Sequence, residues 1–201
     1  MKSLIRKYSL ELLTAILVVV IAITVYLPGT SLIRRILAVY MFLFILHEWE
    51  EIRYPGGFAD LMTGFFEISP DREKLEWAHI PVAVLLIVVL LIPYFFDSVA
   101  MLTLIPAYLG IFEGFIHIVG IKIHKMKKPY TPGMITAVCL CMESIWVFWT
   151  LASRRLVSGT DFIFGAVCMI FAFACMQRVI ISLYGLHYSD LIELAKKKLG
   201  K

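Results

Sequence analysis

Six long apolar runs are the feature that most restricts how this chain can fold. They cover about residues 10–27, 31–51, 77–96, 99–121, 132–153 and 160–186. A membrane-spanning helix needs about 20 mainly apolar residues, so each run is close to the length of one span. Because 61% of the 201 residues are hydrophobic, little sequence remains for a separate soluble domain. We therefore predict an all-α, polytopic membrane protein whose residues 1–201 form one bundle of six transmembrane helices.

The connection between the second and third runs is one of the two longer ones and has a pattern of its own. Its apolar residues Phe58, Leu61, Met62, Phe65 and Phe66 recur at helical spacing. An amphipathic helix of this kind commonly lies in the interface between membrane and water. We expect a short interfacial helix here, and a basic cytoplasmic tail over residues 187–201.

The distribution of basic residues predicts the orientation of the bundle. With six spans both termini lie on one side, and that side holds fourteen of the nineteen lysines and arginines. The other side holds Arg34, Arg35, Arg154 and Arg155, while Arg178 lies inside the sixth run. Since cytoplasmic loops of membrane proteins are enriched in Lys and Arg, both termini are expected in the cytoplasm, with the spans in the cell (inner) membrane.

The net charge of +4 also bears on the partners of the chain. It is spread over separated loops and forms no continuous basic face, which argues against nucleic-acid binding. The expected partners are membrane lipids and a lipophilic small-molecule substrate, and a homo-oligomer is compatible with this composition. The four cysteines lie inside apolar runs, where we interpret them as packing residues.

Histidines and carboxylates inside the apolar runs are the candidate functional residues, because a polar group at membrane depth needs a partner or a wet cavity. In the second run, His47, Glu50 and Glu51 are spaced i, i+3 and i+4, which places them on one helical face. Glu113 and His117 share a face of the fourth run in the same way. In the predicted topology, all five lie towards the cytoplasmic side.

His79, near the start of the third run, is expected at a similar depth. Imidazole nitrogen combined with carboxylate oxygen is a ligand mixture typical of Zn, Fe and Mn. The predicted ligands of a divalent metal ion are His47, Glu51, His79, Glu113 and His117. The predicted catalytic carboxylates are Glu50, Glu51 and Glu113, which would transfer protons. These residues predict a membrane-embedded metalloenzyme, hydrolase-like or an oxidoreductase, that acts on a lipid or lipophilic small molecule.

Three other functions fit the same residues. Without metal, the glutamates and histidines would serve as acid and base of an isomerase acting on a lipophilic substrate. A proton-coupled or ion-coupled transporter would use them as a relay, although the chain shows no internal repeat of spans. A structural or partner-binding membrane protein is the remaining alternative.

Further polar residues are expected to have supporting roles. Glu48 and Glu76 are predicted to be solvated charges, and Glu143 with Arg178 is predicted to form an ion pair within the membrane. Tyr130 follows the fourth run and is expected to cap the polar site as a hydrogen-bond donor.

The segment HEWEE at residues 47–51 resembles the His-x-x-Glu-Glu pattern that gives its name to the HXXEE family of multispan prokaryotic membrane proteins. The segments YPGGF at 54–58 and YTPG at 130–133 are similar to later motifs of that family, with Thr131 where the family has Ser. The resemblance covers about residues 36–140 and implies that His47, Glu50 and Glu51 form a shared polar core. It implies no activity, because the function of the family is unknown.

Overall fold

Helices make up the secondary structure of the chain. A computed structural model describes residues 2–198, which contain no β-strand. The six long helices are α2 (Ser9–Tyr26), α3 (Leu32–Ile52), α5 (Arg72–Phe95), α6 (Leu104–Ile123), α7 (Met134–Ser153) and α8 (Gly159–Leu183). The short ones are α1 (Lys2–Lys7), α4 (Phe58–Phe65), the 3-10 helix η1 (Ala100–Thr103) and α9 (Tyr188–Lys198). The prediction of an all-α fold is confirmed.

Five of the long elements have the length and apolar composition of membrane spans: α2, α5, η1 with α6, α7 and α8. They support a multipass membrane protein. The remaining long helix, α3, has 21 residues but carries Arg34 and Arg35 near its start and Glu48, Glu50 and Glu51 near its end. Its charges set it apart from the five apolar helices, although it is a largely buried element of the bundle.

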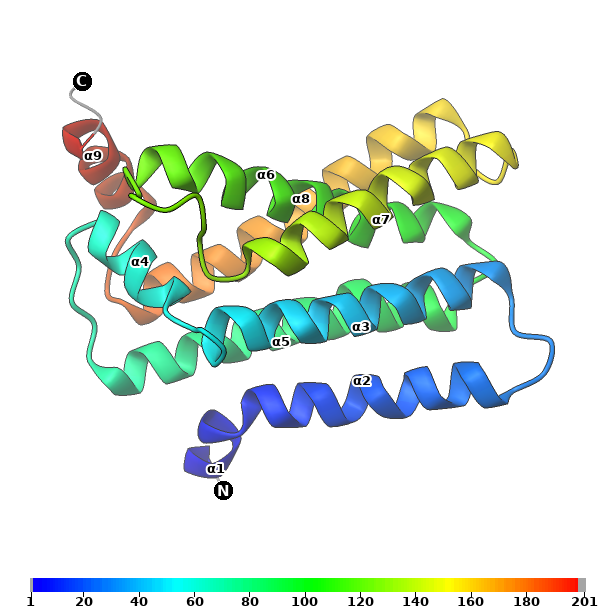
Figure 1. The fold of residues 1–201 in the computed structure, drawn as a ribbon, viewed down its shortest axis with the longest axis horizontal. Helices are drawn as coiled ribbons and strands as arrows, with labels where there is room; N and C mark the ends of the chain where they lie inside the picture. The colour runs from blue at the N-terminus through cyan, green and yellow to red at the C-terminus, as the bar shows by residue number, and fades with distance from the viewer. Residues whose placement is uncertain (1, 199–201) are drawn as a thin grey trace.

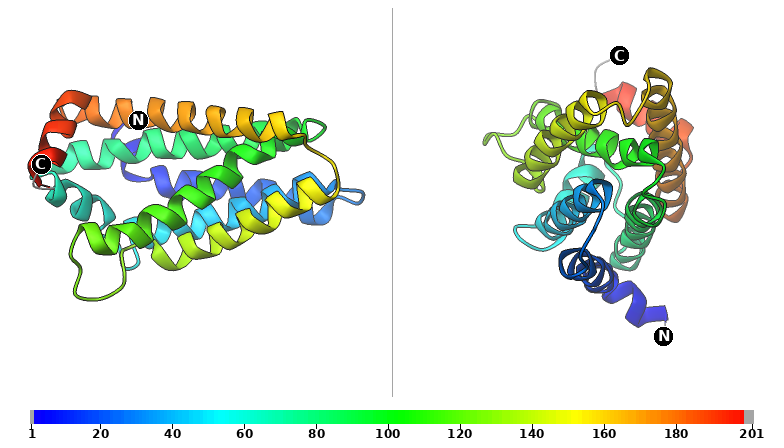
Figure 2. Two further views of the ribbon diagram at one scale, coloured as in Figure 1. Left: turned by 90° about the horizontal axis from the view of Figure 1, so that it is seen from above. Right: turned by 90° about the vertical axis from the view of Figure 1, so that its right-hand side faces the viewer.

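The long helices run side by side along the length of the molecule, and both ends of the chain lie at the same end of the bundle (Figure 1). Figure 2 shows α4 and α9 at that end as well. Helix α3 packs against α2, α5 and α7, whereas α6 packs against α7 and α8. The core between the helices includes the fully buried side chains of Tyr40, Leu90 and Leu104. Thus α3 and α6 approach each other mainly through their side chains.

Two glycines fix the position of α6 against α7. A Cβ atom added at Gly110 would lie 3.0 Å from the carbonyl oxygen of Leu140, and one at Gly114 would lie 2.6 Å from Cys141 Cβ. Small residues spaced four apart allow two membrane helices to pack backbone to backbone. This close packing holds the face of α6 that carries Glu113 and His117 in a defined orientation.

Ion pairs hold both ends of α3. Near its start, Arg34 Nη2 lies 3.2 Å from Asp97 Oδ1, just after α5, and Ser31 Oγ donates a 2.6 Å hydrogen bond to the same carboxylate. Just after its end, Arg53 Nη2 lies 2.9 Å from Glu11 Oε1 of α2. These contacts restrict sliding and rotation of α3, and so set the direction in which its histidine and glutamates point.

Candidate metal centre

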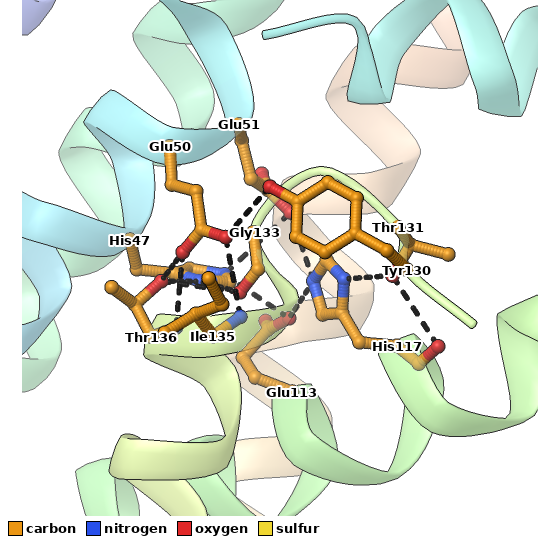
Figure 3. A network of polar contacts seen from close by, with 10 residues as sticks. All are labelled: His47, Glu50, Glu51, Glu113, His117, Tyr130, Thr131, Gly133, Ile135 and Thr136. Atoms are coloured by element: carbon orange, nitrogen blue, oxygen red, sulfur yellow. Dashed lines mark hydrogen bonds and ion pairs between the residues drawn. The ribbon is translucent and has the colours of Figure 1, made fainter. Parts of the chain in front are cut away.

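Four side chains from α3 and α6 meet between these helices (Figure 3). They are His47 and Glu51 of α3 with Glu113 and His117 of α6, and one ligand atom from each lies within 4.8 Å of all the others. His47 Nε2 is 3.5 Å from Glu51 Oε1 and 3.6 Å from Glu113 Oε2. His117 Nε2 is 3.0 Å from Glu51 Oε1 and 3.8 Å from Glu113 Oε2. We call these four residues the His/Glu centre.

The other ring nitrogen of each imidazole is held by an oxygen atom outside the centre. His47 Nδ1 lies 3.1 Å from the carbonyl oxygen of Gly133, which can only accept, so this Nδ1 carries a proton. His117 Nδ1 lies 2.9 Å from Thr131 Oγ1, whose hydroxyl donates to the His117 carbonyl oxygen at 3.4 Å. The hydroxyl is therefore free to accept from Nδ1. In the neutral imidazoles both Nε2 lone pairs then face the two carboxylates.

This arrangement places negative charge against electron lone pairs in a buried position. Among the described residues, the ion-pair partners of Glu51 and Glu113 are the two imidazoles alone. His117 is 1% exposed, and its Nε2 makes no hydrogen bond of acceptable geometry. A divalent cation would balance the charge of both carboxylates and accept both lone pairs. The Nδ1 hydrogen bonds match those that orient metal-binding histidines in proteins, so the residues fit a Zn, Fe or Mn ion.

Gly133 brings backbone directly against the His/Glu centre. It precedes α7 with φ +92°, a conformation that favours glycine. A Cβ atom at this position would lie 2.7 Å from Glu51 Cγ, 2.8 Å from His117 Cε1 and 3.0 Å from His47 Cε1. The absence of a side chain is therefore required for the carbonyl of Gly133 to reach His47.

Glu50 belongs to α3, but its side chain lies outside the His/Glu centre and contacts the start of α7. Its carboxylate accepts hydrogen bonds from Tyr130 OH at 2.9 Å, Ile135 N at 3.2 Å, Thr136 N at 3.0 Å and Thr136 Oγ1 at 2.6 Å. Burial and the bond to Glu50 raise the pKa of Tyr130 to about 12, so this phenol stays a donor at neutral pH. Four bonds use the accepting capacity of the carboxylate. Glu50 thus holds the segment that carries Gly133, while its catalytic role stays a prediction.

Replacing Glu50 by glutamine is expected to destabilise the fold and leave metal binding in place. The substitution removes the charge from hydrogen bonds worth about 1.5–3 kcal/mol each, so we expect the free energy of unfolding to fall by about 2 kcal/mol. Thermal unfolding and elemental analysis measure the two effects. Tyr130→Phe, which removes one donor, should cost about 1 kcal/mol. Unchanged stability with loss of metal in Glu50→Gln would contradict this role.

A cavity of about 730 Å³ lies beside the His/Glu centre, and His47, Glu51 and Glu113 form part of its wall. Helices α3, α5, α6 and α8 enclose most of it, and residues of α1, α2, α4 and α9 complete its wall at the end of the bundle that carries the termini. Phe58, the first residue of α4, packs over His117 with ring centroids 5.0 Å apart. His79 lines the same cavity but is not one of the four clustered residues. The structure therefore brings together four of the five predicted ligands.

Two charged residues that the sequence predicts to be solvated have different surroundings. The expectation that Glu48 is solvated is wrong, because its side of α3 faces the cavity and the residue is 7% exposed. Glu76 is half-buried, and Oε2 of its carboxylate lies 3.0 Å from Arg6 Nε. Its Oε1 lies 3.5 Å from Arg72 Nε. Glu48 thus adds a third carboxylate to the cavity wall near the centre.

The ion pair expected between Glu143 and Arg178 is not among those of the described residues. Arg178 is exposed, and Glu143 Oε1 is buried without a hydrogen-bond partner. The reason is the packing of α8, which lies along α5 and α6 rather than along α7. The four cysteines are free thiols, and two of them, Cys139 and Cys175, lie on exposed helix faces.

The residues that orient the imidazoles are not predicted as site residues by the sequence. These are Thr131, Gly133 and Thr136, whose hydroxyl or carbonyl oxygens contact the histidine Nδ1 atoms. The YTPG segment is the sequence feature that could have indicated Thr131 and Gly133, since proline and glycine mark a fixed turn. His47 and Gly133 are 86 residues apart, and no local pattern links positions at that separation.

Comparison with known proteins places the sequence in one described group. A family model described as "Protein of unknown function with HXXEE motif" matches residues 38–147. This stretch is more than half of the chain and includes the whole His/Glu centre and the YTPG segment. No curated protein matches the chain. No solved structure matches it either.

Proposed function

The chain belongs to the HXXEE family, and from this membership and the geometry of the His/Glu centre we propose that it is a membrane-embedded metalloenzyme. His47, Glu51, Glu113 and His117 would hold one Zn, Fe or Mn ion. The substrate is a lipid or lipophilic small molecule that enters the cavity beside them. Hydrolytic and redox chemistry are two versions of this proposal.

One observation carries the proposal: four ligand atoms from two helices converge within 4.8 Å beside a cavity. Two carboxylates carry two negative charges, which a divalent ion balances. Oxygen atoms outside the centre hold the Nδ1 atoms, so both Nε2 atoms point inward. Two adjacent carboxylates in a largely buried position are costly unless they are neutralised, which favours a bound cation.

When bound, such an ion polarises a carbonyl or phosphoryl oxygen, or supports redox chemistry. The residues of the chain supply the remaining functions. Glu51 and Glu113 line the cavity and can hold or move a proton at their carboxylate oxygens. His47 and His117 are fixed by hydrogen bonds, which keeps the site preorganised. Phe58 covers His117 and excludes water from that side.

We include in this proposal the topology of the chain in the membrane. Helix α3 crosses the bilayer as a sixth span, since its 21 residues have the required length. Its charged groups face protein partners or the cavity, apart from the exposed Arg35 near its start. The end of the bundle that carries both termini faces the cytoplasm, in the cell membrane, because most basic residues lie there. Helix α4 lies at the interface, and membrane lipids contact the exposed apolar faces of the spans.

Removal of metal tests the proposal. Protein purified from membranes without added metal is expected to contain about one equivalent of Zn, Fe or Mn by elemental analysis. Because the ion joins α3 to α6, its removal by a chelator should lower the free energy of unfolding. The loss is about 2.7 kcal/mol relative to protein with free metal at one hundred times Kd, and it should reverse on adding metal back.

Two outcomes would contradict the proposal in different ways. Protein that contains no metal and gains no stability from Zn, Fe or Mn would overturn the metal site. If such protein still isomerised a lipophilic substrate, the acid and base alternative would replace it.

A further inference from the structure

We propose that the cavity binds a single-chain amphiphile, with its hydrocarbon chain below the His/Glu centre and its polar head at the mouth. This inference rests on the proposed function, because it names the substrate class of the same site. Its basis is the change in wall chemistry along the depth of the cavity, which a molecule with one apolar end and one polar end matches.

The part of the cavity on the far side of the centre is lined by apolar side chains from all four enclosing helices. They are Phe44 of α3, Leu85 and Leu86 of α5, Leu109 and Phe112 of α6, and Phe173 of α8. On α6, Leu109 lies four residues beyond Glu113, so this part extends about 6 Å beyond the centre along the helix axis. We call it the apolar chamber. Its walls offer water no hydrogen-bond partner, so it suits hydrocarbon.

The apolar chamber has a closed floor. The next buried layer consists of Tyr40, Leu90 and Leu104, which are fully buried and do not line the cavity. Phe112 and Phe173 pack edge to face with ring centroids 4.7 Å apart and close the space between α6 and α8. A hydrocarbon chain can therefore enter from the side of the His/Glu centre and must end at this floor. Such a chamber limits chain length.

The part of the cavity nearer the termini adds charged groups to a wall that also contains apolar residues such as Met62, Phe66 and Leu75. Its wall includes Arg53 after α3, Asp60 of α4, and Arg72 and Glu76 at the start of α5. These groups suit the polar head of an amphiphile, and the His/Glu centre lies between them and the apolar chamber. The volume of about 730 Å³ falls in the range of about 300–1,000 Å³ that is usual for small-molecule sites. The bond nearest the head group would lie beside the centre.

Photocrosslinking with alkyl probes tests this placement. The metal-loaded full-length chain is reconstituted in phosphatidylcholine nanodiscs, and an alkyl alcohol carrying a diazirine is added, either at the end of the chain or beside the head. The probe with the diazirine at the end of the chain is expected to label peptides that contain Leu86, Leu109 or Phe173. The probe with the diazirine beside the head is expected to label peptides that contain Arg53 or Glu76. Labelling is expected although the two-chain phosphatidylcholine of the bilayer is present in large excess, and excess unlabelled dodecanol should reduce it at least about tenfold.

Two variants on α6 give a matched comparison. Leu109→Trp fills the apolar chamber and is expected to abolish labelling by the terminal diazirine. Ile118→Trp adds the same side chain at a position that is 53% exposed, and should leave labelling unchanged. Phe173→Ala enlarges the apolar chamber, so this variant should be labelled less strongly by the dodecyl probe and more strongly by a hexadecyl probe. This variant keeps the test decisive if Leu109→Trp does not fold.

Metal content separates the possible failures. Protein with a full equivalent of metal that is labelled only at outward positions such as Val88 or Ile118 would overturn the amphiphile site and leave the metal site intact. Labelling that excess dodecanol does not reduce would also overturn the amphiphile site, since the probe would then contact the protein as a general lipid. Protein without metal would overturn the proposed function itself.

Discussion

His47→Ala and His117→Ala proteins are expected to lose metal affinity by at least about 100-fold relative to the unmodified chain. Each substitution removes one of the two imidazole ligands and leaves three of the four ligands of the centre. A loss of supporting hydrogen bonds alone costs 10–100-fold in known metal sites, so loss of a ligand should reach or exceed the upper end of that range. Elemental analysis and competition with a chromogenic chelator measure the loss.

His79→Ala is the matched control for these two variants. His79 is also a histidine of the cavity wall, and the sequence predicts it as a ligand, but it lies outside the four clustered residues. We expect the variant to retain a full equivalent of metal with unchanged affinity. Loss of metal in His79→Ala together with full binding in His117→Ala would show that the ion is held elsewhere.

Gly133→Ala is expected to have the second large effect. The methyl group would approach three of the four ligands to 3.0 Å or less, and φ is +92° at this residue. Backbone strain of about 1–3 kcal/mol and overpacking of about 1–3 kcal/mol predict destabilisation by about 4 kcal/mol. Because the methyl group displaces Glu51, His117 and His47, metal binding should fall as well. Thermal unfolding and metal content are the measurements.

Gly57→Ala provides the control for the backbone contribution. Gly57 precedes α4 with φ +95°, in the same conformation and at the same position relative to its helix as Gly133, but a Cβ there meets no atom within 4 Å. Its substitution should cost only the strain and leave metal content unchanged. Equal metal content in both variants would mean that Gly133 does not shape the centre.

Part of this site follows from local spacing. Residues four apart share a helix face, so the pairing of His47 with Glu51 and of Glu113 with His117 could be predicted within each apolar run. The different roles of the adjacent Glu50 and Glu51 could not be predicted in this way. Successive residues on a helix point about 100° apart, and only the packing of α3 shows that Glu51 faces α6 while Glu50 faces α7.

The depth of a residue in the membrane, predicted from the topology, identified the metal ligands only in part. It placed His79 near the other polar residues, and His79 does line their cavity. Depth fixes one coordinate, however, and the rotation of α5 about its axis decides whether a side chain reaches the centre. Glu48 is predicted to be solvated, but α3 has protein on several sides, and the side of this helix that carries Glu48 faces the cavity.

The sequence by itself determined that this chain is helical and apolar enough for a membrane, and that two helices each carry a His and Glu pair on one face. Those features depend on hydrophobicity and on a helical period, which act over a few residues. The tertiary structure decided that the two pairs meet, that Gly133 and Thr131 orient them from a distant loop, and that a blind apolar chamber adjoins them. These features depend on the rotation and packing of whole helices, which side-chain contacts far apart in the sequence determine.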